Sequence, residues 1–369
     1  MRFLIPTYPG DVHAVEVALA LEAREHEVLQ WYGSDFPILQ SASIELRQER
    51  LEWSLQGPGL SGGSPPFDVV WMRRPTPPVL PKGLHPGDVP VARRECHEFL
   101  NSLYPLVAPE AFWVNSLESC RWAECKAVQL REAVRAGLTI PPTLMSNDPA
   151  RIRQFLTEFH GRAIFKPFYI AQWSGEERVA MMLTSDVSIE DLPEDGTLRI
   201  TPGIFQAKIP KAYELRVTIM GEHIVTARLH SQEVEAARTD WRAAGALIRI
   251  EPGLLPSSVE ETCLRLMRRL GIVFGCFDFI VTPEGEHVFL EVNPAGQFLW
   301  VEAANPDILL LAPFIEFLQA RRRDFRWHPA PRSIRHRDFY PRSSEQIAAE
   351  QSLHIPPAQV FVSSDELAQ

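Results

Sequence analysis

The order of apolar and polar positions at the start of the chain predicts strands separated by a helix. Residues 2–6 form a short apolar run that is typical of a buried strand. Residues 11–24 mix valine and leucine with small and charged residues, which indicates a helix, and residues 27–32 predict a second strand. The apolar run 67–72 predicts another buried strand. Because a strand–helix–strand order brings strands together in parallel, we expect a parallel sheet here.

Residues 57–66 (GPGLSGGSPP) contain glycine and proline in place of an apolar pattern, and we interpret them as a flexible connection. Their glycines do not have the G-x-G-x-x-G or G-x-x-x-x-G-K spacing of phosphate-binding loops.

Helical and strand patterns follow one another in the rest of the chain. The helix predicted over 116–136 has Asn115 or Ser116 as its cap and ends at Gly137, while Asn147-Asp148-Pro149 resembles the start of another helix. A strand-rich region then extends over 163–292. It includes hairpins at Gly221-Glu222 and Pro283–Glu286 and is interrupted by a helix at 257–270; a last apolar helix is predicted over 309–322.

Composition narrows the class of protein. With 369 residues the chain is long enough for two or three domains, and 45% apolar and 23% charged residues argue against disorder or coiled coil. The formal charge of −10 disfavours nucleic acid as a partner. No apolar run is long enough for a membrane helix, and the first residues lack the pattern of a signal peptide. Five cysteines without a C-x-x-C pair indicate reduced thiols, so we expect a cytoplasmic location.

The hairpin CFDFIVTPEGEHVFLEVNP, residues 276–294, carries the strongest local signal. A turn over Pro283–Glu286 pairs Thr282 with His287, and that register places Asp278 opposite Glu291 and Cys276 opposite Asn293. Side chains alternate between the faces of a strand, so Asp278, Glu291 and Asn293 share one face. The other face is apolar and is expected in the core: Phe277, Phe279, Val281, Val288, Leu290 and Val292.

Two opposing carboxylates in apolar strands repel each other and lose hydration, so a cation is expected between them. Oxygen ligands without histidine or cysteine suit Mg²⁺. The alternative is a partly exposed sheet face with solvated acids, because a one-residue slip in register separates the pair.

Basic residues supply further signals. Lys126 lies in the 116–136 helix, and Lys166 lies within the apolar segment AIFKPF. Glu214 and Arg216 are two residues apart and therefore share a strand face. Taken singly, each lysine is more typical of a solvated or snorkelling side chain, and Arg216 is equally suited to a surface cross-strand pair.

Together and in this order, these segments resemble the ATP-grasp superfamily, and more closely the ATP-grasp ligases that macrocyclise ribosomal peptides, the microviridin-type or graspetide maturases. The resemblance covers about residues 1–320, and NPAGQFLWVE is its most specific part. FYIAQWSGEE after Lys166 departs from the compact glycine-rich loop of many ATP-grasp enzymes. The matching segments are NSLESCRWAECKAVQLREAVRAGLTIPPTL, KAYELRVTIMGE, HSQ with TDWR, FDFIVTPEGEHVFLEVNPAGQFLWVE and, apart from Met72, WMRRP.

The resemblance implies roles for individual residues. Lys126 and Lys166 correspond to the lysines that hold ATP phosphates, and Glu214 to the acid that accepts the ribose hydroxyls. Arg216 and Arg242 correspond to arginines near the γ-phosphate and the acyl phosphate. The hinge that meets adenine corresponds to Gln206, Ala207, Lys208 and Ile209, and the Mg²⁺ ligands correspond to Asp278, Glu291 and Asn293.

The fold implied is α/β (α+β), an ATP-grasp fold with an N-terminal pre-ATP-grasp domain at 1–115. The two ATP-grasp lobes are expected at 116–205 and 206–322, followed by an Arg/Pro-rich extension at 323–369. The reaction implied uses ATP and Mg²⁺ to phosphorylate Asp or Glu side chains of a ribosomally made precursor peptide. Ser, Thr or Lys side chains then close ω-ester or ω-amide rings. The family also implies recognition of the leader and core segments of the precursor and often a homodimer. The negative charge and the absence of a long apolar run lead us to expect no nucleic-acid or membrane partner.

Three alternatives remain open from the sequence. The first is an ATP-grasp ligase that joins an amino acid to a small molecule or a protein tail, as glutathione synthetases and glutamate ligases do. The second is a nucleotide- or peptide-binding module without catalysis. A hydrolase with paired carboxylates is the third and weakest, because directly opposed acids in a hairpin suit a metal better.

The C-terminal extension reverses the charge of the chain locally. Residues 321–342 contain eight arginines against two acids. A solvated tail or one that docks on its own protein explains this pattern. The alternative is a surface that binds an acidic precursor.

Overall fold

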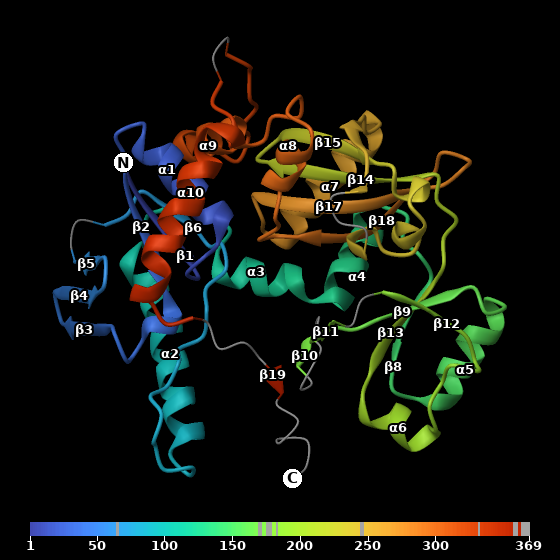
Figure 1. Cartoon of the computed structure of the whole chain (residues 1–369), viewed down its shortest axis with the longest axis horizontal. Helices are drawn as coiled ribbons and strands as arrows, with labels where there is room; N and C mark the ends of the chain where they lie inside the picture. Colours follow the sequence, from blue (N-terminus) through green and yellow to red (C-terminus); the bar gives the residue numbers. More distant parts are fainter. Residues whose placement is uncertain are drawn as a thin grey trace.

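The computed structural model describes residues 1–63, 66–168, 172–174, 179–181, 184–243, 247–330, 333–356 and 361–362. The chain begins with the expected parallel sheet, in the strand order β2-β1-β6-β7. Figure 1 labels β1, β2 and β6 of this sheet. Helix α1 joins the first two strands, and α2 precedes β7. Their bounds are β1 (Arg2–Thr7), α1 (Val12–Glu22), β2 (Glu27–Tyr32), β6 (Val69–Trp71), α2 (Val89–Val107) and β7 (Phe112–Val114).

The expectation of a flexible connection over 57–66 is wrong for residues 57–62. Gly57 ends β4 (Arg50–Gly57), and β5 (Leu60–Gly62) folds back onto it in an antiparallel sheet with β3 (Ser41–Arg47). Gly59 has φ +67°, a conformation that favours glycine and allows the tight turn between the two strands. Leu60 is buried and anchors the short strand. Residues 64–65 lie outside the described ranges.

The helix predicted over 116–136 is two helices, α3 (Leu117–Glu124) and α4 (Lys126–Ala136). The hydroxyl of Ser116 caps α3 by accepting a hydrogen bond from the Ser119 backbone N–H, and Gly137 ends α4 with φ +98°. Cys125 between them has extended dihedrals, φ −67° and ψ 102°. The break places Lys126 at the first position of α4.

A small sheet in the order β12-β9-β13-β8 follows, with antiparallel pairing. The expected cap at Asp148 is present, since its carboxylate accepts hydrogen bonds from Ala150 and Arg151 backbone N–H groups. Strand β13 contains residues 205 and 206, between which the border of the two predicted lobes was expected. The elements are β8 (Thr143–Ser146), α5 (Pro149–Glu158), β9 (Ala163–Lys166), β10 (Gln172–Ser174), β11 (Val179–Met181), β12 (Ser185–Val187), α6 (Asp195–Ile200) and β13 (Gly203–Ala207).

The largest sheet has the order β16-β15-β14-β17-β18. One of its faces packs on α4 and α7 through a core that includes Phe277, Phe279 and Phe289. On the other face, Phe274 and its neighbours pack against α8, α9 and the N-terminal sheet. The bounds are β14 (Tyr213–Met220), β15 (His223–Leu229), β16 (Ile250–Pro252), α7 (Ser257–Leu270), β17 (Phe274–Val281), β18 (His287–Asn293), α8 (Leu299–Ala304) and α9 (Leu311–Ala320). Short 3₁₀ turns are η1 (Gly33–Asp35), η2 (Ser231–Glu233), η3 (Glu235–Ala237), η4 (Trp241–Ala243) and η6 (Gln351–Leu353).

The chain after α9 returns to the N-terminal sheet and its helix α1. Helix α10 (His336–Glu350) lies along α1, as Figure 1 shows, and buries Phe339 in the core shared with that helix. His336 Nδ1 is 2.6 Å from Glu16 Oε2, and His354 Nδ1 is 2.7 Å from Asp35 Oδ2. This part of the extension therefore docks on its own protein, and the two-residue strand β19 (Phe361–Val362) pairs with β10. None of the helices in the described ranges is long and apolar enough to cross a membrane.

Candidate active site

The site begins as two rows of side chains across three neighbouring strands. Arg216 of β14 pairs with Asp278 of β17, which pairs in turn with Glu291 of β18. The next row along the strands contains Thr218, Cys276 and Asn293 in the same order. Because side chains alternate in strands, both rows lie on one sheet face. The expected opposition of Asp278 to Glu291 and of Cys276 to Asn293 is present.

The predicted register is wrong nearer the turn. Val281, rather than Thr282, pairs with His287, and the register shifts between Asp278 and Phe279. This bulge leaves Leu290 without its own partner, so the pairing beyond it returns to the predicted register. As a result Leu290, expected in the core, lines the cavity at the site, and Phe289 is buried in its place.

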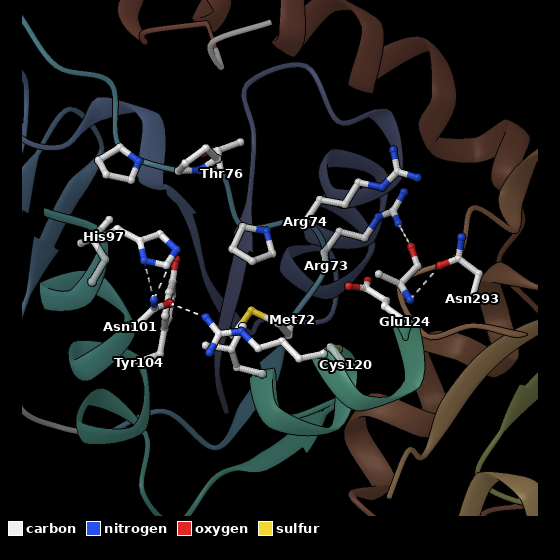
Figure 2. A pocket seen from close by; sticks show the side chains of 17 residues that line it. Met72, Arg73, Arg74, Thr76, His97, Asn101, Tyr104, Cys120, Glu124 and Asn293 are labelled. Carbon is white, nitrogen blue, oxygen red and sulfur yellow. Dashed lines mark hydrogen bonds between the residues drawn. The ribbon is translucent and has the colours of Figure 1, made fainter. Parts of the chain in front are cut away.

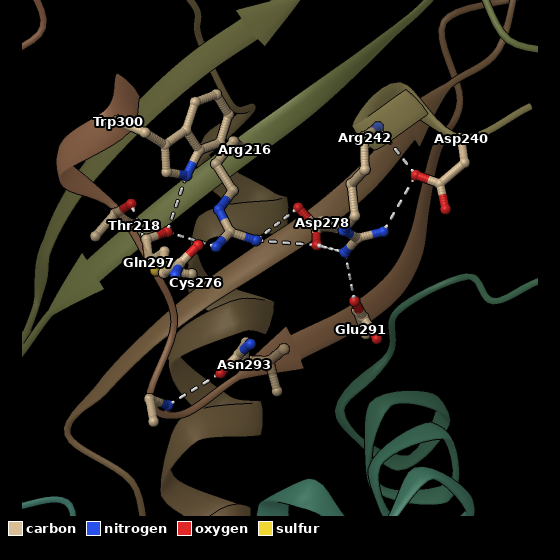
Figure 3. A network of polar contacts seen from close by, with 12 residues as sticks. Arg216, Thr218, Asp240, Arg242, Cys276, Asp278, Glu291, Asn293, Gln297 and Trp300 are labelled. Carbon is tan, nitrogen blue, oxygen red and sulfur yellow. Dashed lines mark hydrogen bonds and ion pairs between the residues drawn. The ribbon is translucent and has the colours of Figure 1, made fainter. Parts of the chain in front are cut away.

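Arg216 and Arg242 hold the first carboxylate from two sides (Figure 3). Arg216 Nη1 donates to both oxygens of Asp278, at 2.9 and 3.0 Å, and both side chains are buried. Arg242 Nη2 lies 3.6 Å from Asp278 Oδ2 and 3.1 Å from Glu291 Oε1. Asp240 in turn accepts hydrogen bonds from the backbone N–H and the guanidinium of Arg242, which fixes its orientation.

Lys126 meets the second carboxylate. Its Nζ donates to Glu291 Oε2 from the first position of α4. Burial alone would raise the pKa of Glu291, but Lys126 and Arg242 lower it to about 2. Glu291 is therefore ionised at neutral pH and surrounded by positive charge.

Lys166 differs from Lys126 in having no hydrogen bond or ion pair with the side chains that the structure describes. Burial lowers its pKa, nearby Glu291 raises it, and Lys126 and Arg242 lower it further. A buried amine next to other cations has the chemistry to bind an anion.

The predicted hinge begins inside β13, which contains Gln206 and Ala207, and continues beyond it. Gln206 Nε2 donates to Thr143 Oγ1 at 3.0 Å, and the backbone N–H groups of Ala207 and Lys208 donate to Pro142 and Arg162 carbonyls. Ile209 follows at the wall of the cavity. These contacts join the hinge to the small sheet.

Glu214 lies beyond the hinge and pairs with Lys211, at 2.8 Å between Nζ and Oε1. Burial raises the pKa of Glu214, and Lys211 lowers it.

The site residues predicted from the sequence line one cavity of about 1330 Å³. Its lining includes each of the residues predicted from the sequence: Lys126, Lys166, Gln206, Ala207, Lys208, Ile209, Glu214, Arg216, Arg242, Asp278, Glu291 and Asn293. Apolar side chains gather in the same lining, among them Leu130, Met145, Ile164, Ile280 and Leu290. The cavity thus combines apolar walls that suit a planar base with cations that suit phosphates.

The donor set fits a magnesium ion by its chemistry. Asp278 and Glu291 supply carboxylate oxygens and Asn293 an amide oxygen, all on the cavity wall. Asn293 Oδ1 accepts a hydrogen bond from the Ala295 backbone N–H at 3.1 Å, so its oxygen has a fixed direction. In the described ranges no cluster of three or more His, Cys, Asp and Glu side chains suits a metal, so a site made only of such residues is not found there.

Several residues that support the site were not predicted. Gln129 of α4 bonds to both backbone groups of Val292, at 2.7 and 3.0 Å, and so fixes β18 between its two site residues. Arg73, in the WMRRP segment, is fully buried, pairs with Asp11 and donates to the Ala295 carbonyl. The Arg-Arg-Pro segment was the available signal for Arg73, whereas the burial of Gln129 is visible only in the structure.

Trp241 and Trp300, which flank the site, stack with ring centroids 4.7 Å apart. Trp300 Nε1 also donates to the Gln297 carbonyl, as does Arg216.

The proteins found to be similar to this chain are ones with solved structures. No protein-family model matches the chain, and a search of curated proteins finds no match. The chain is similar to a RiPP-associated ATP-grasp ligase of Chryseobacterium gregarium, solved with ADP and a leader and core peptide. The two chains are 25% identical. The match covers 89% of this chain and 99% of the ligase, with a TM-score of 0.79.

Two macrocyclases of Microcystis aeruginosa are also similar. MdnC, solved with the precursor peptide MdnA, is 28% identical, with 87% of this chain and 100% of MdnC covered and a TM-score of 0.76. MdnB is 31% identical, with 86% of this chain and 98% of MdnB covered and a TM-score of 0.73. The expected ATP-grasp fold is confirmed.

Proposed function

Since the chain belongs to the microviridin-type ATP-grasp ligases of ribosomal peptides, we propose that it is an ADP-forming peptide macrocyclase. In this proposal ATP phosphorylates Asp or Glu side chains of a precursor peptide. A Ser or Thr hydroxyl or a Lys amine of the same peptide then displaces phosphate, which closes an ω-ester or ω-amide ring.

The single observation that carries the proposal is the common cavity. Residues that lie as far apart in the sequence as Lys126 and Asn293 line it together, with apolar and cationic walls. The solved complexes with ADP and with precursor peptides support a nucleotide and a peptide as its ligands, since those complexes belong to similar ligases.

In this function two anions must meet, the γ-phosphate and the peptide carboxylate, so the cations of the cavity do most of the work. Lys126 and Lys166 hold the phosphates, and Lys166 has no competing partner among the described side chains. Arg242 orients the group to be transferred and offsets charge that develops on it. Arg216 holds Asp278 in place through hydrogen bonds to both carboxylate oxygens.

Asp278, Glu291 and Asn293 would hold Mg²⁺, which supplies charge neutralisation at the phosphates when it is bound. The apolar wall near Gln206, Ala207, Lys208 and Ile209 would take adenine, and Glu214 would accept the ribose hydroxyls. When the nucleotide binds, the ribose would then replace Lys211 as the partner of Glu214.

We extend the proposal to the domains and the assembly. The pre-ATP-grasp domain is assigned to 1–115, and the two lobes to 116–205 and 206–322. The family implies a homodimer, which sedimentation analysis of the full chain tests directly. The leader of the precursor would bind in addition to the core.

Co-expression with a candidate precursor tests the proposed function. The candidate is a short peptide rich in Thr, Ser, Asp and Glu that is encoded beside this chain. Mass spectrometry should show the loss of one water for each ring, and purified enzyme should release ADP only when the peptide is present. Activity with free amino acids and none with peptides would instead favour the small-molecule ligases.

A further inference from the structure

A second cavity adjoins the first on the side of the N-terminal sheet. Its volume is about 550 Å³, and prolines of the loop 75–78 and the ring of Tyr104 form part of its wall (Figure 2). Arg74, Glu124 and Asn293 line both cavities. The two spaces therefore meet at these side chains, next to the residue proposed to bind Mg²⁺.

Glu124 differs from the other acids of the larger cavity, because each of the others has a cationic partner. Glu214 pairs with Lys211, Asp240 with Arg242, Asp278 with Arg216, and Glu291 with Lys126. Glu124, the last residue of α3, has no ion pair or side-chain hydrogen bond with any residue in the described ranges. Its carboxylate is therefore available to a bound molecule.

The surroundings of Glu124 also favour proton transfer. Desolvation raises the pKa of its carboxyl group, while Lys126 and Arg74 lower it. A carboxylate with a raised pKa accepts a proton more readily than an ordinary one. Lys126, which we propose to hold a phosphate, lies near enough to Glu124 to influence its pKa.

From this placement we propose that Glu124 is the base that deprotonates the attacking nucleophile, and that the second cavity holds the peptide side chain which carries it. The inference rests on the proposed function. As the hydroxyl oxygen bonds to the acyl carbon, its proton passes to Glu124. The bond between the acyl carbon and the phosphate oxygen breaks, and the proton leaves with the phosphate.

The experiment compares Glu124→Gln with wild type and with Glu118→Gln, an exposed glutamate on the same helix that lines neither cavity. The substrate is the peptide that wild type cyclises. Ring closure is measured by mass spectrometry. The acyl phosphate is measured separately as the hydroxamate that forms with added hydroxylamine, a nucleophile that needs no base.

In Glu124→Gln, ring closure should fall about 100-fold or more, while hydroxamate formation and ADP release in hydroxylamine stay within about threefold of wild type. Glu118→Gln should match wild type in both. Wild-type ring closure in Glu124→Gln, or an equal fall of both rates, overturns the role as a base. If wild type forms neither rings nor hydroxamate, the proposed function fails instead.

Discussion

Arg216 and Asp278 lie directly opposite each other on β14 and β17, and one guanidinium nitrogen contacts both carboxylate oxygens. The side chains are 6% and 8% exposed, so the pair is largely removed from water. Breaking such a pair leaves a buried charge without a partner, which costs more than the pair itself contributes. The pair therefore links the stability of the sheet to the chemistry of the site.

A double-mutant cycle tests this link. Arg216→Met should lower the free energy of unfolding by about 3 kcal/mol, because Asp278 is then buried without its main cation. The further change Asp278→Asn should recover at least about 1 kcal/mol of that loss. Urea denaturation measures both effects. Ring formation should be absent in the double variant although stability returns, and additive effects on stability would contradict the coupling.

The contribution of Glu291 to the stability of the folded protein should depend on pH and be lost at low pH. Its pKa in the folded protein is about 2, below the ordinary value of 4.5, because Lys126 and Arg242 outweigh the effect of burial. A lowered pKa gives stability that is present above pH 4.5 and is lost as the pH falls towards 2. The free energy of unfolding of wild type should therefore fall over this range more steeply than that of Glu291→Gln. Glu286→Gln, an exposed change in the same hairpin, should retain the wild-type slope.

The sequence predicted the opposed carboxylates correctly although the assumed turn register was off by one residue. Period-two alternation of Asp278, Glu291 and Asn293 with a phenylalanine-rich face was enough to identify the shared face. The bulge at Leu290 depends on how Phe289 fits between Phe277 and Phe279 in the core. Such packing is a tertiary effect that a local pattern does not contain.

The break at Cys125 was equally hidden from the sequence. Residues 116–136 have continuous helical character, with no glycine or proline that would mark an interruption. The two helices are instead set by tertiary contacts, among them the hydrogen bonds of Gln129 to Ala123 and Val292. Side-chain partners over long sequence distances, such as Arg73 with Ala295, were not predictable for the same reason.

Lys166 should make nucleotide binding depend on pH. Burial lowers its pKa in the free protein, and a bound phosphate favours the charged amine. ATP affinity should therefore weaken as the pH rises through the lowered pKa. Lys166→Met should bind ATP at least about tenfold more weakly at neutral pH and should lack this dependence. Calorimetric titration at several pH values measures it, with the exposed Lys82→Met as control. Parallel pH profiles for wild type and Lys166→Met would show that Lys166 does not contact the phosphates.

The docked C-terminal helix should be sensitive to alkaline pH through His336. Its hydrogen bond to the fully buried Glu16 raises the pKa of His336 above the ordinary 6.5, and burial raises the pKa of Glu16 as well. A histidine with a raised pKa gives stability that is complete below pH 6.5 and is lost as the pH rises through the raised value. The melting temperature of wild type should thus fall between about pH 6 and pH 9, and that of His336→Gln should be lower at pH 6 but change less.

His328→Gln, a change at an exposed histidine of the same extension, should behave as wild type. If the melting temperatures of wild type and His336→Gln change equally with pH, protonation of His336 in its pair with Glu16 does not stabilise the packing of α10 on α1.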